Sequence, residues 1–154
     1  MLHTSCPSTE RASAESFSYR YPRKEDYPTY DGRVESNHVL FIKEITELRD
    51  IRKIPDSEIL GMLPSILTNA AKRWWTYELK QGYTTWNQWA VAITRRFSKD
   101  AWFRHLENQI QRSRFTQAHL DDPTGWANRY IELLESYDPD ITVASIRHRF
   151  CRAM

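Results

Sequence analysis

Apolar residues recur at spacings of three and four from residue 39 almost to the end of the chain, and this period constrains the fold most. The segment HVLFIKEITELRDI, residues 38–51, is typical, because charged side chains fill the face opposite its apolar positions. Such a period predicts amphipathic helices. No stretch alternates apolar and polar residues over a useful length, and only 4 of the 154 residues are glycine. The sequence therefore predicts an all-α protein.

Capping signals define the start of the first two helices. Asn37 or Ser36 is expected to cap a helix that begins near residue 38, and Asp56 or Ser57 is expected to cap the next one. Pro64 lies inside the second apolar pattern, where it removes one backbone hydrogen bond. We therefore expect a kink or an early end of that helix.

A third and a fourth helix follow within the next thirty or so residues. Asn69 suits a left-handed turn before the third helix, which covers about 70–81 and stops at Gly82. Thr85 and Gln88 have the spacing of a capping box at the start of the fourth. The expected apolar stripe of the fourth helix consists of Trp86, Trp89, Ile93 and Phe97.

The rest of the chain predicts three more helices after a break at 98–100, with a loop at 119–126. Either Asp140 or Thr142 is expected to cap the last one. The expected apolar positions are Trp102, Phe103, Leu106 and Ile110; then Trp126, Tyr130, Leu133, Leu134 and Tyr137; then Val143, Ile146 and Phe150.

Residues 1–30 lack this helical period and predict an extended or disordered lead, poor in large aliphatic residues and interrupted by prolines. Its second half contains Tyr19, Tyr21, Tyr27 and Tyr30. One interpretation is a tail whose last aromatic residues lie across the folded part. The alternative is a peptide motif for a partner, using the polyproline tendency of DYPTYDG, residues 26–32.

Motifs for catalysis are missing: the sequence has no G-x-S-x-G, no P-loop and no glycine-rich turn. The acidic pairs at 121–122 and 138–140 lie beside prolines in expected turns, where aspartate accepts hydrogen bonds from the backbone. His148 and Cys151 share one expected helix, but a metal site needs three or four ligands. We expect no enzyme, with no catalytic residue, no cofactor and no metal.

The compartment is indicated by the cysteines and by the lack of targeting signals. Cys6 and Cys151 show no disulfide-type spacing, which fits a reducing interior. No apolar run approaches the roughly 20 residues of a membrane span, and the first residues lack the apolar region of a secretory signal. We therefore expect a cytoplasmic protein with no membrane partner.

The segment AAKRWWTYELK, residues 70–80, has two interpretations: a surface that stacks nucleic-acid bases, or aromatic side chains packed into a core. Helical spacing places Trp75 on one stripe with Ala71 and Leu79, while Trp74 lies about 100° away. We therefore predict that Trp75 is a core residue and that Trp74 is a flanking or contact residue.

The neighbouring basic doublets Lys72/Arg73 and Arg95/Arg96 are candidate RNA contacts. Basic doublets are more often a solvated helix face, although together they can steer RNA weakly. A net charge of +2 is too small for a dedicated nucleic-acid binder, which concentrates its basic residues. Weak RNA binding is therefore a secondary expectation.

Taken in order, these motifs resemble the Gag capsid region of gypsy-type LTR retrotransposons, and the capsid lobes of the domesticated relative Arc look similar. The resemblance covers YDG (30–32), FIKEI (41–45), LPSILTNAAKRWWTYEL (63–79) and TTWNQWAVAITRRFSKD (84–100). It continues more weakly toward the end of the chain. The signature positions are Tyr30, Asp31 and Gly32; Ala71, Trp74 and Trp75; Thr85, Trp86 and Trp89; and Phe97.

The resemblance implies a bilobed helical capsid protein that self-associates, around element RNA, and has no enzymatic lobe. It implies an N-lobe of about four helices over 31–99 and a C-lobe over 100–154. The C-lobe is expected to be incomplete, because family members continue for further helices beyond the position of Met154. The Gln-Gly and Glu signature of retroviral C-lobes is not recognisable. The alternative is a domesticated lobe whose groove binds a peptide ligand without assembling a shell.

Overall fold

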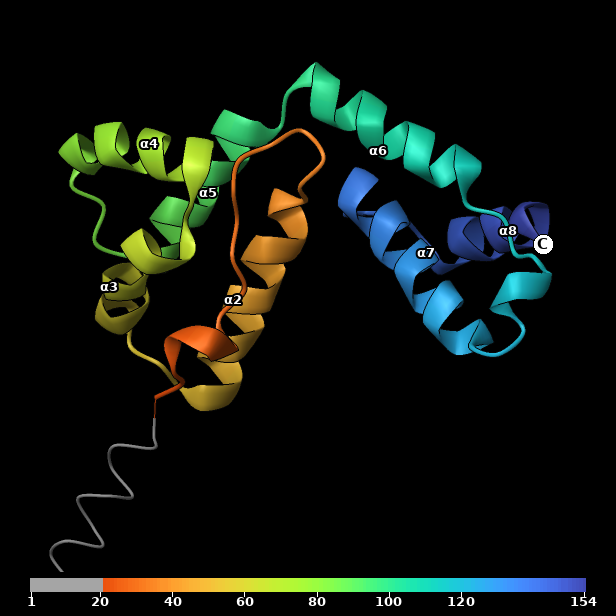
Figure 1. Cartoon of the computed structure of the whole chain (residues 1–154), viewed down its shortest axis with the longest axis horizontal. Coiled ribbons are helices and arrows are strands. Elements are labelled where there is room, and N and C mark those ends of the chain that lie inside the picture. The colour runs from red at the N-terminus through yellow and green to blue at the C-terminus, as the bar shows by residue number, and fades with distance from the viewer. Residues whose placement is uncertain (1–20) are drawn as a thin grey trace, which may run out of the picture.

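The computed structural model describes residues 21–154, and over this range the chain is all-α as predicted (Figure 1). The predicted lead up to residue 20, with Tyr19 and Cys6, lies outside the described residues. The seven α-helices of this range are α2 (His38–Arg52), α3 (Asp56–Ile66), α4 (Asn69–Glu78), α5 (Trp86–Phe97), α6 (Asp100–Arg112), α7 (Pro123–Tyr137) and α8 (Val143–Ala153). Short 3-10 helices are η1 (Lys24–Asp26), η2 (Leu79–Gln81) and η3 (Gln117–His119).

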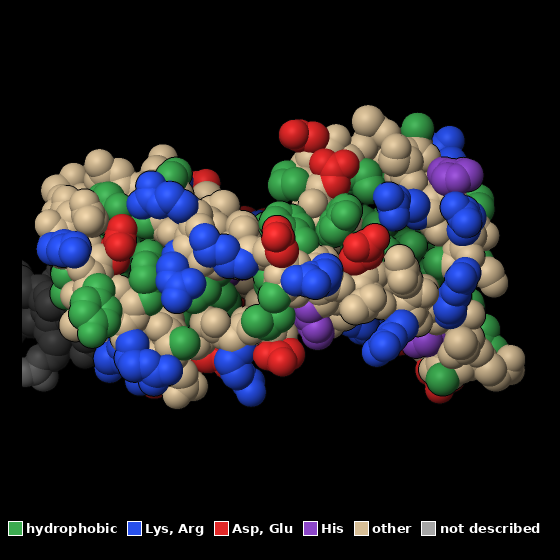
Figure 2. Space-filling model, turned by 90° about the horizontal axis from the view of Figure 1, so that it is seen from above, with side chains coloured by type: hydrophobic (Ala, Val, Ile, Leu, Met, Phe, Trp, Pro, Cys, Tyr) green, Lys and Arg blue, Asp and Glu red, His purple; other side chains and the backbone are tan. Residues whose placement is uncertain are grey.

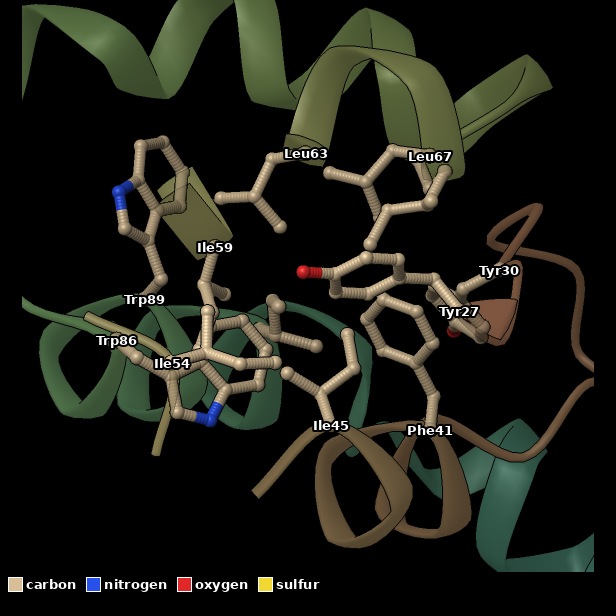
Figure 3. Packing of buried hydrophobic residues seen from close by; sticks show 13 residues of the cluster. Tyr27, Tyr30, Phe41, Ile45, Ile54, Ile59, Leu63, Leu67, Trp86 and Trp89 are labelled. Atoms are coloured by element: carbon tan, nitrogen blue, oxygen red, sulfur yellow. The ribbon is translucent and has the colours of Figure 1, made fainter. Parts of the chain in front are cut away.

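Buried apolar side chains of residues 21–154 form two clusters. The first cluster joins α2, α3, α4 and α5, shown at the left of Figure 1, and Figure 3 shows its interior. It consists of Tyr27, Tyr30, Phe41, Ile45, Ile54, Ile59, Leu63, Ile66, Leu67, Ala71, Trp86, Trp89 and Ile93. The second cluster joins α6, α7 and α8, and it consists of Trp102, Leu106, Ile110, Trp126, Tyr130, Leu134 and Ala153.

The residues just before α2 belong to the first cluster, which supports the first interpretation of the lead for its last aromatic residues. Tyr27 and Tyr30 are buried among side chains from α2 and α3 (Figure 3). Tyr30 forms an isolated parallel bridge with Leu67: its N–H donates to the Ile66 carbonyl at 3.0 Å, and its carbonyl accepts from Thr68 N–H at 2.9 Å. Packing of the chain therefore begins before residue 31.

Helix boundaries in the first half follow the predicted signals with one exception. Asn37 caps α2 by accepting from Leu40 N–H, and Thr85 and Gln88 form the predicted capping box of α5. The prediction that Asp56 or Ser57 caps α3 is wrong: Pro55 is the N-cap residue, and no side chain caps it. The Asp56 carboxylate instead accepts from a backbone N–H of α5, which uses its hydrogen-bonding capacity outside its own helix.

Four residues of the first half have left-handed backbone angles, and one of them, Lys53 with φ +53°, ends α2. Asn69 has φ +49° at the start of α4, and Gly82 has φ +67° after η2, both as predicted. Gly32 has φ +82°, and its α-carbon lies directly against the first turn of α4. α3 continues for two residues beyond Pro64 and ends at Ile66, so the proline is followed by an early end.

The second half also follows its predicted signals in part. Asp122 caps α7 by accepting from Gly125 N–H, with Pro123 in the first turn, and Thr142 caps α8. The prediction that Val143 belongs to the apolar stripe of α8 is wrong, because its side chain is 72% exposed. None of the helices in residues 21–154 has the length and apolar character needed to cross a bilayer.

Candidate functional site

The aromatic surface formed by α4 and α5 is the first candidate site. Trp74 and Trp75 are both half-buried and both lie on Trp89, with ring centroids 6.1 and 6.5 Å apart. Trp74 also meets the edge of Phe97 at 5.4 Å. The prediction that Trp75 is a core residue is therefore wrong, because the two tryptophans share the flank of the first cluster.

The predicted apolar stripe Ala71, Trp75 and Leu79 is buried only at its first residue, Ala71. Ala71 is fully buried, but Leu79 is 46% exposed and Tyr77 is 76% exposed. The helix ends at Glu78 and η2 follows, so Leu79 no longer keeps the angle that an α-helix would give it. Exposed and half-buried apolar side chains therefore remain available along α4 and η2.

Basic side chains surround this aromatic surface. Lys72, Arg73, Arg95 and Arg96 are all exposed, and Figure 2 shows Lys and Arg side chains gathered on the face over α4, α5 and α6. Arg95 is partly neutralised, because it lies 3.6 Å from the Glu78 carboxylate.

The other three basic side chains form no ion pair within residues 21–154. Arg96 covers the Phe97 ring, with its guanidinium carbon 5.2 Å from the ring centroid. The arrangement can attract an anionic chain, but base stacking on Trp74 or Trp75 is restricted since both rings already contact Trp89.

The remaining signature residues are parts of the first cluster or of its entry turn. Tyr30, Trp86 and Trp89 are buried, and burial raises the pKa of the Tyr30 hydroxyl above its usual value, with a smaller contribution from Asp31. The Asp31 carboxylate accepts from Ser36 at 2.6 Å and from Arg33, and these contacts lower its pKa. These residues stabilise the fold of the first cluster and its entry turn.

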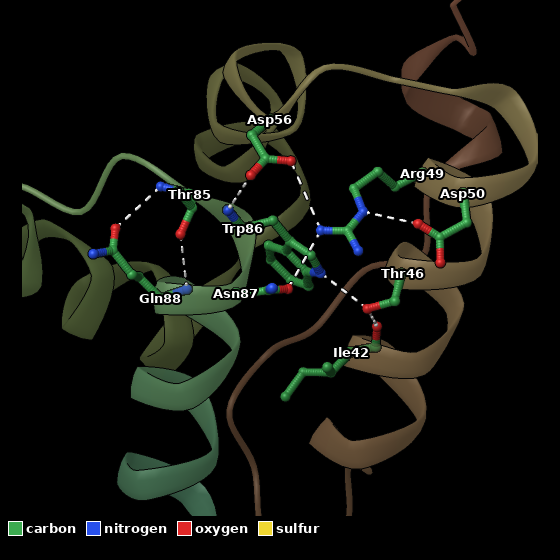
Figure 4. A network of polar contacts seen from close by, with 9 residues as sticks. All are labelled: Ile42, Thr46, Arg49, Asp50, Asp56, Thr85, Trp86, Asn87 and Gln88. Atoms are coloured by element: carbon green, nitrogen blue, oxygen red, sulfur yellow. Dashed lines mark hydrogen bonds and ion pairs between the residues drawn. The ribbon is translucent and has the colours of Figure 1, made fainter.

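A polar network ties α2 and α3 to the start of α5 (Figure 4). The Asp56 carboxylate accepts from Trp86 N–H at 3.0 Å and lies 3.7 Å from Arg49. The indole N–H of Trp86 donates to the Thr46 hydroxyl at 3.0 Å. The sequence did not predict this network, because its partners lie up to forty residues apart. Each of these residues could equally well bind a group within its own helix.

A second polar contact that sequence reasoning missed joins α2 to the α5–α6 link. His38 is fully buried, its Nε2 lies 2.8 Å from the Ser98 hydroxyl, and its ring centroid lies 4.4 Å from that of Trp102. Since His38 precedes Phe41 by three residues and Ile45 by seven, the apolar period of α2 was a usable signal for its burial.

This serine–histidine pair lacks the other parts of a catalytic site. Within residues 21–154, Nδ1 of His38 has no hydrogen-bond partner, so no carboxylate orients the ring. Burial lowers the pKa of His38 to about 4, and aromatic rings surround the pair. The pair is a structural contact between α2 and the α5–α6 link, with His38 fully buried and Ser98 partly buried.

Metal ligands are not gathered anywhere in the described part of the chain. No group of three or more His, Cys, Asp or Glu side chains in residues 21–154 is placed to hold an ion. His148 and Cys151 are both exposed on α8. The aspartates of the two predicted turns bind the backbone: Asp122 accepts from Gly125 N–H, and Asp138 accepts from Asp140 N–H.

Comparisons of the chain with protein-family models, with curated proteins and with solved structures found no match.

Proposed function

We propose that this chain is a structural, self-associating helical protein of the retrotransposon Gag capsid type, located in the cytoplasm and without enzymatic activity. The observation that supports this most is the pair of separate hydrophobic clusters joined between Phe97 and Asp100 by the link Ser98–Lys99. Two rigid lobes on a short link present separate surfaces that can tile a curved lattice. Weak contacts suffice, because many copies multiply them.

The α4–α5 surface offers an apolar contact for such assembly. Val91 on α5 is 63% exposed, and it borders a hollow of about 280 Å³ that Tyr83, Ala92 and Arg95 also line. Exposed apolar side chains beside a hollow are typical of protein contacts. The basic side chains Lys72, Arg73, Arg95 and Arg96 on the same helices support a weak contact with packaged RNA.

Light scattering over a wide range of protein concentration and salt tests the proposal. We expect oligomers that grow with concentration, and Val91→Asp weakens association at least tenfold, about 1.4 kcal/mol. The matched control is Asn108→Asp, which adds the same charge at an exposed position of α6. A strict monomer at high concentration with added RNA overturns the proposal.

A second candidate function is a peptide-binding module that forms no shell. The observation in its favour is the entry segment, whose residues Tyr27 and Tyr30 are already held by the helices as an extended peptide. Removing residues 1–29 is expected to keep the helical fold, increase the binding of a hydrophobic dye and lower the melting temperature. A peptide of residues 21–29 added in trans then reverses both changes. Unchanged dye binding and melting temperature exclude this function.

A further inference from the structure

A concave site lies at the other end of the molecule, where α6 ends and α8 passes close to the segment after it. This hollow has a volume of about 260 Å³. Its apolar part is formed by the buried residues Ile110, Tyr130 and Ala153. Its polar part is formed by Gln111, Ser113 and three arginines, Arg114, Arg149 and Arg152. No aspartate or glutamate is among the eight lining residues.

The three arginines reach this hollow from two segments. Arg149 and Arg152 lie three residues apart in α8 and therefore share a face of that helix. Arg114 approaches from the segment after α6, and its guanidinium donates to the Arg152 carbonyl. None of the three forms an ion pair with any carboxylate in residues 21–154. Three positive charges thus meet around one hollow without a counterion from the described chain.

Capping of α8 explains only part of this arrangement. Arg114 binds a carbonyl of the last turn, and Arg152 lies in that turn, where a cation favours the helix dipole. Arg149 lies one turn earlier and makes no hydrogen bond to the described residues. All three arginine side chains are exposed, so water screens their mutual repulsion, and together they attract an anion toward the hollow.

We infer that this hollow is a binding site for a phosphate-bearing anion. Arginine is suited to phosphate because its planar guanidinium presents several N–H donors in a fork that matches two phosphate oxygens. At the right of Figure 2, arginine side chains line the edge of the molecule near the end of α6 and α8. The site lies on α6–α8 and does not depend on the proposed self-association through α5.

Calorimetric titration of the full chain with inorganic pyrophosphate tests the site. We expect one binding site per chain, and the double variant Arg149→Gln/Arg152→Gln weakens binding at least tenfold. The control is Arg147→Gln with Arg104→Gln, which removes the same charge from exposed positions outside the hollow and changes affinity less than twofold. Circular dichroism of both variants verifies that their helical content is unchanged.

A second arm of the experiment distinguishes the sources of the phosphate. An oligouridylate is titrated at the same ionic strength and the same phosphate concentration. Tighter binding of pyrophosphate would identify the ligand as a free polyphosphate, whereas tighter binding of the oligonucleotide would identify it as a nucleic-acid backbone. In both cases the double variant must weaken binding of the preferred ligand. An equal loss of affinity in the control variant overturns the site, as does an undiminished affinity in the double variant.

Discussion

At the scale of single residues, His38 has the most unusual surroundings in the described chain. It is an ionisable side chain that is fully buried between Tyr30, Phe97 and Trp102, with one ring nitrogen bound to Ser98 and the other unpaired. Burial without an anionic partner disfavours the charged imidazolium. The pKa is accordingly lowered from 6.5 to about 4.

This shift predicts a loss of stability in mild acid. The folded-state pKa of His38 lies below the unfolded-state value, so the unfolded chain binds the proton more readily. The free energy of unfolding is expected to fall as the pH drops from about 6.5 to about 4, by about 3 kcal/mol in total from this group. Urea unfolding at a series of pH values in this window measures the change.

The variant His38→Leu tests the assignment, with the exposed His148→Gln as the control. His38→Leu is expected to remove most of the slope in this window, while His148→Gln keeps it. Burial raises the pKa of Glu44, which acts with the opposite sign, but this contribution is common to all three proteins and cancels in the comparison. A slope that is unchanged in His38→Leu contradicts the prediction.

At the scale of elements, local signals predicted the helices and most of their ends. The N-caps Asn37 and Thr85 each bind a backbone N–H within the first turn of their own helix. Because both partners are close in sequence, these caps could be predicted from local spacing. Asp56 was misassigned because its partner lies thirty residues away, beyond any local signal. The exposure of Trp75 and Leu79 was also misjudged, since helical spacing relates residues to one another but does not say which side meets a neighbour.

The approach of α4 to the entry turn depends on a glycine. A β-carbon on Gly32 would lie 2.7 Å from the backbone nitrogen of Ala71, and φ is +82° there. That nitrogen donates to the Asp31 carbonyl at 3.2 Å, so the contact cannot widen without breaking a hydrogen bond. We expect Gly32→Ala to lower the free energy of unfolding by at least about 2 kcal/mol, which thermal or urea unfolding measures.

Gly61→Ala is the matched control for Gly32→Ala, because Gly61 lies in α3, a helix of the first cluster. It lies inside α3, and a β-carbon there meets no atom within 4 Å. Because alanine has a higher helix propensity, Gly61→Ala is expected to raise the free energy of unfolding by about 0.5–1 kcal/mol. Equal effects of the two substitutions would contradict the structural reason given for Gly32.

At the scale of the whole molecule, the two clusters meet through a junction of polar, aromatic and apolar contacts. Asn37 donates to the Ser136 hydroxyl at 2.9 Å, and the Trp102 indole donates to the Ser36 carbonyl at 3.2 Å. The sequence predicted the break at 98–100. It did not predict this junction, because the contacts join residues 66 and 99 positions apart.

Such a junction predicts that the two clusters lose their structure separately. Leu134 is buried in the second cluster and Leu63 in the first, and replacing either by alanine is expected to cost about 2–5 kcal/mol locally. Hydrogen exchange then reports where protection is lost: on α6, α7 and α8 in Leu134→Ala, and on α2, α3, α4 and α5 in Leu63→Ala. The first turn of α2 is expected to respond to both, because His38 touches both Phe97 and Trp102. Loss of protection over all seven helices in either variant would show one cooperative unit, and the two-lobed basis of the proposed assembly would then be wrong.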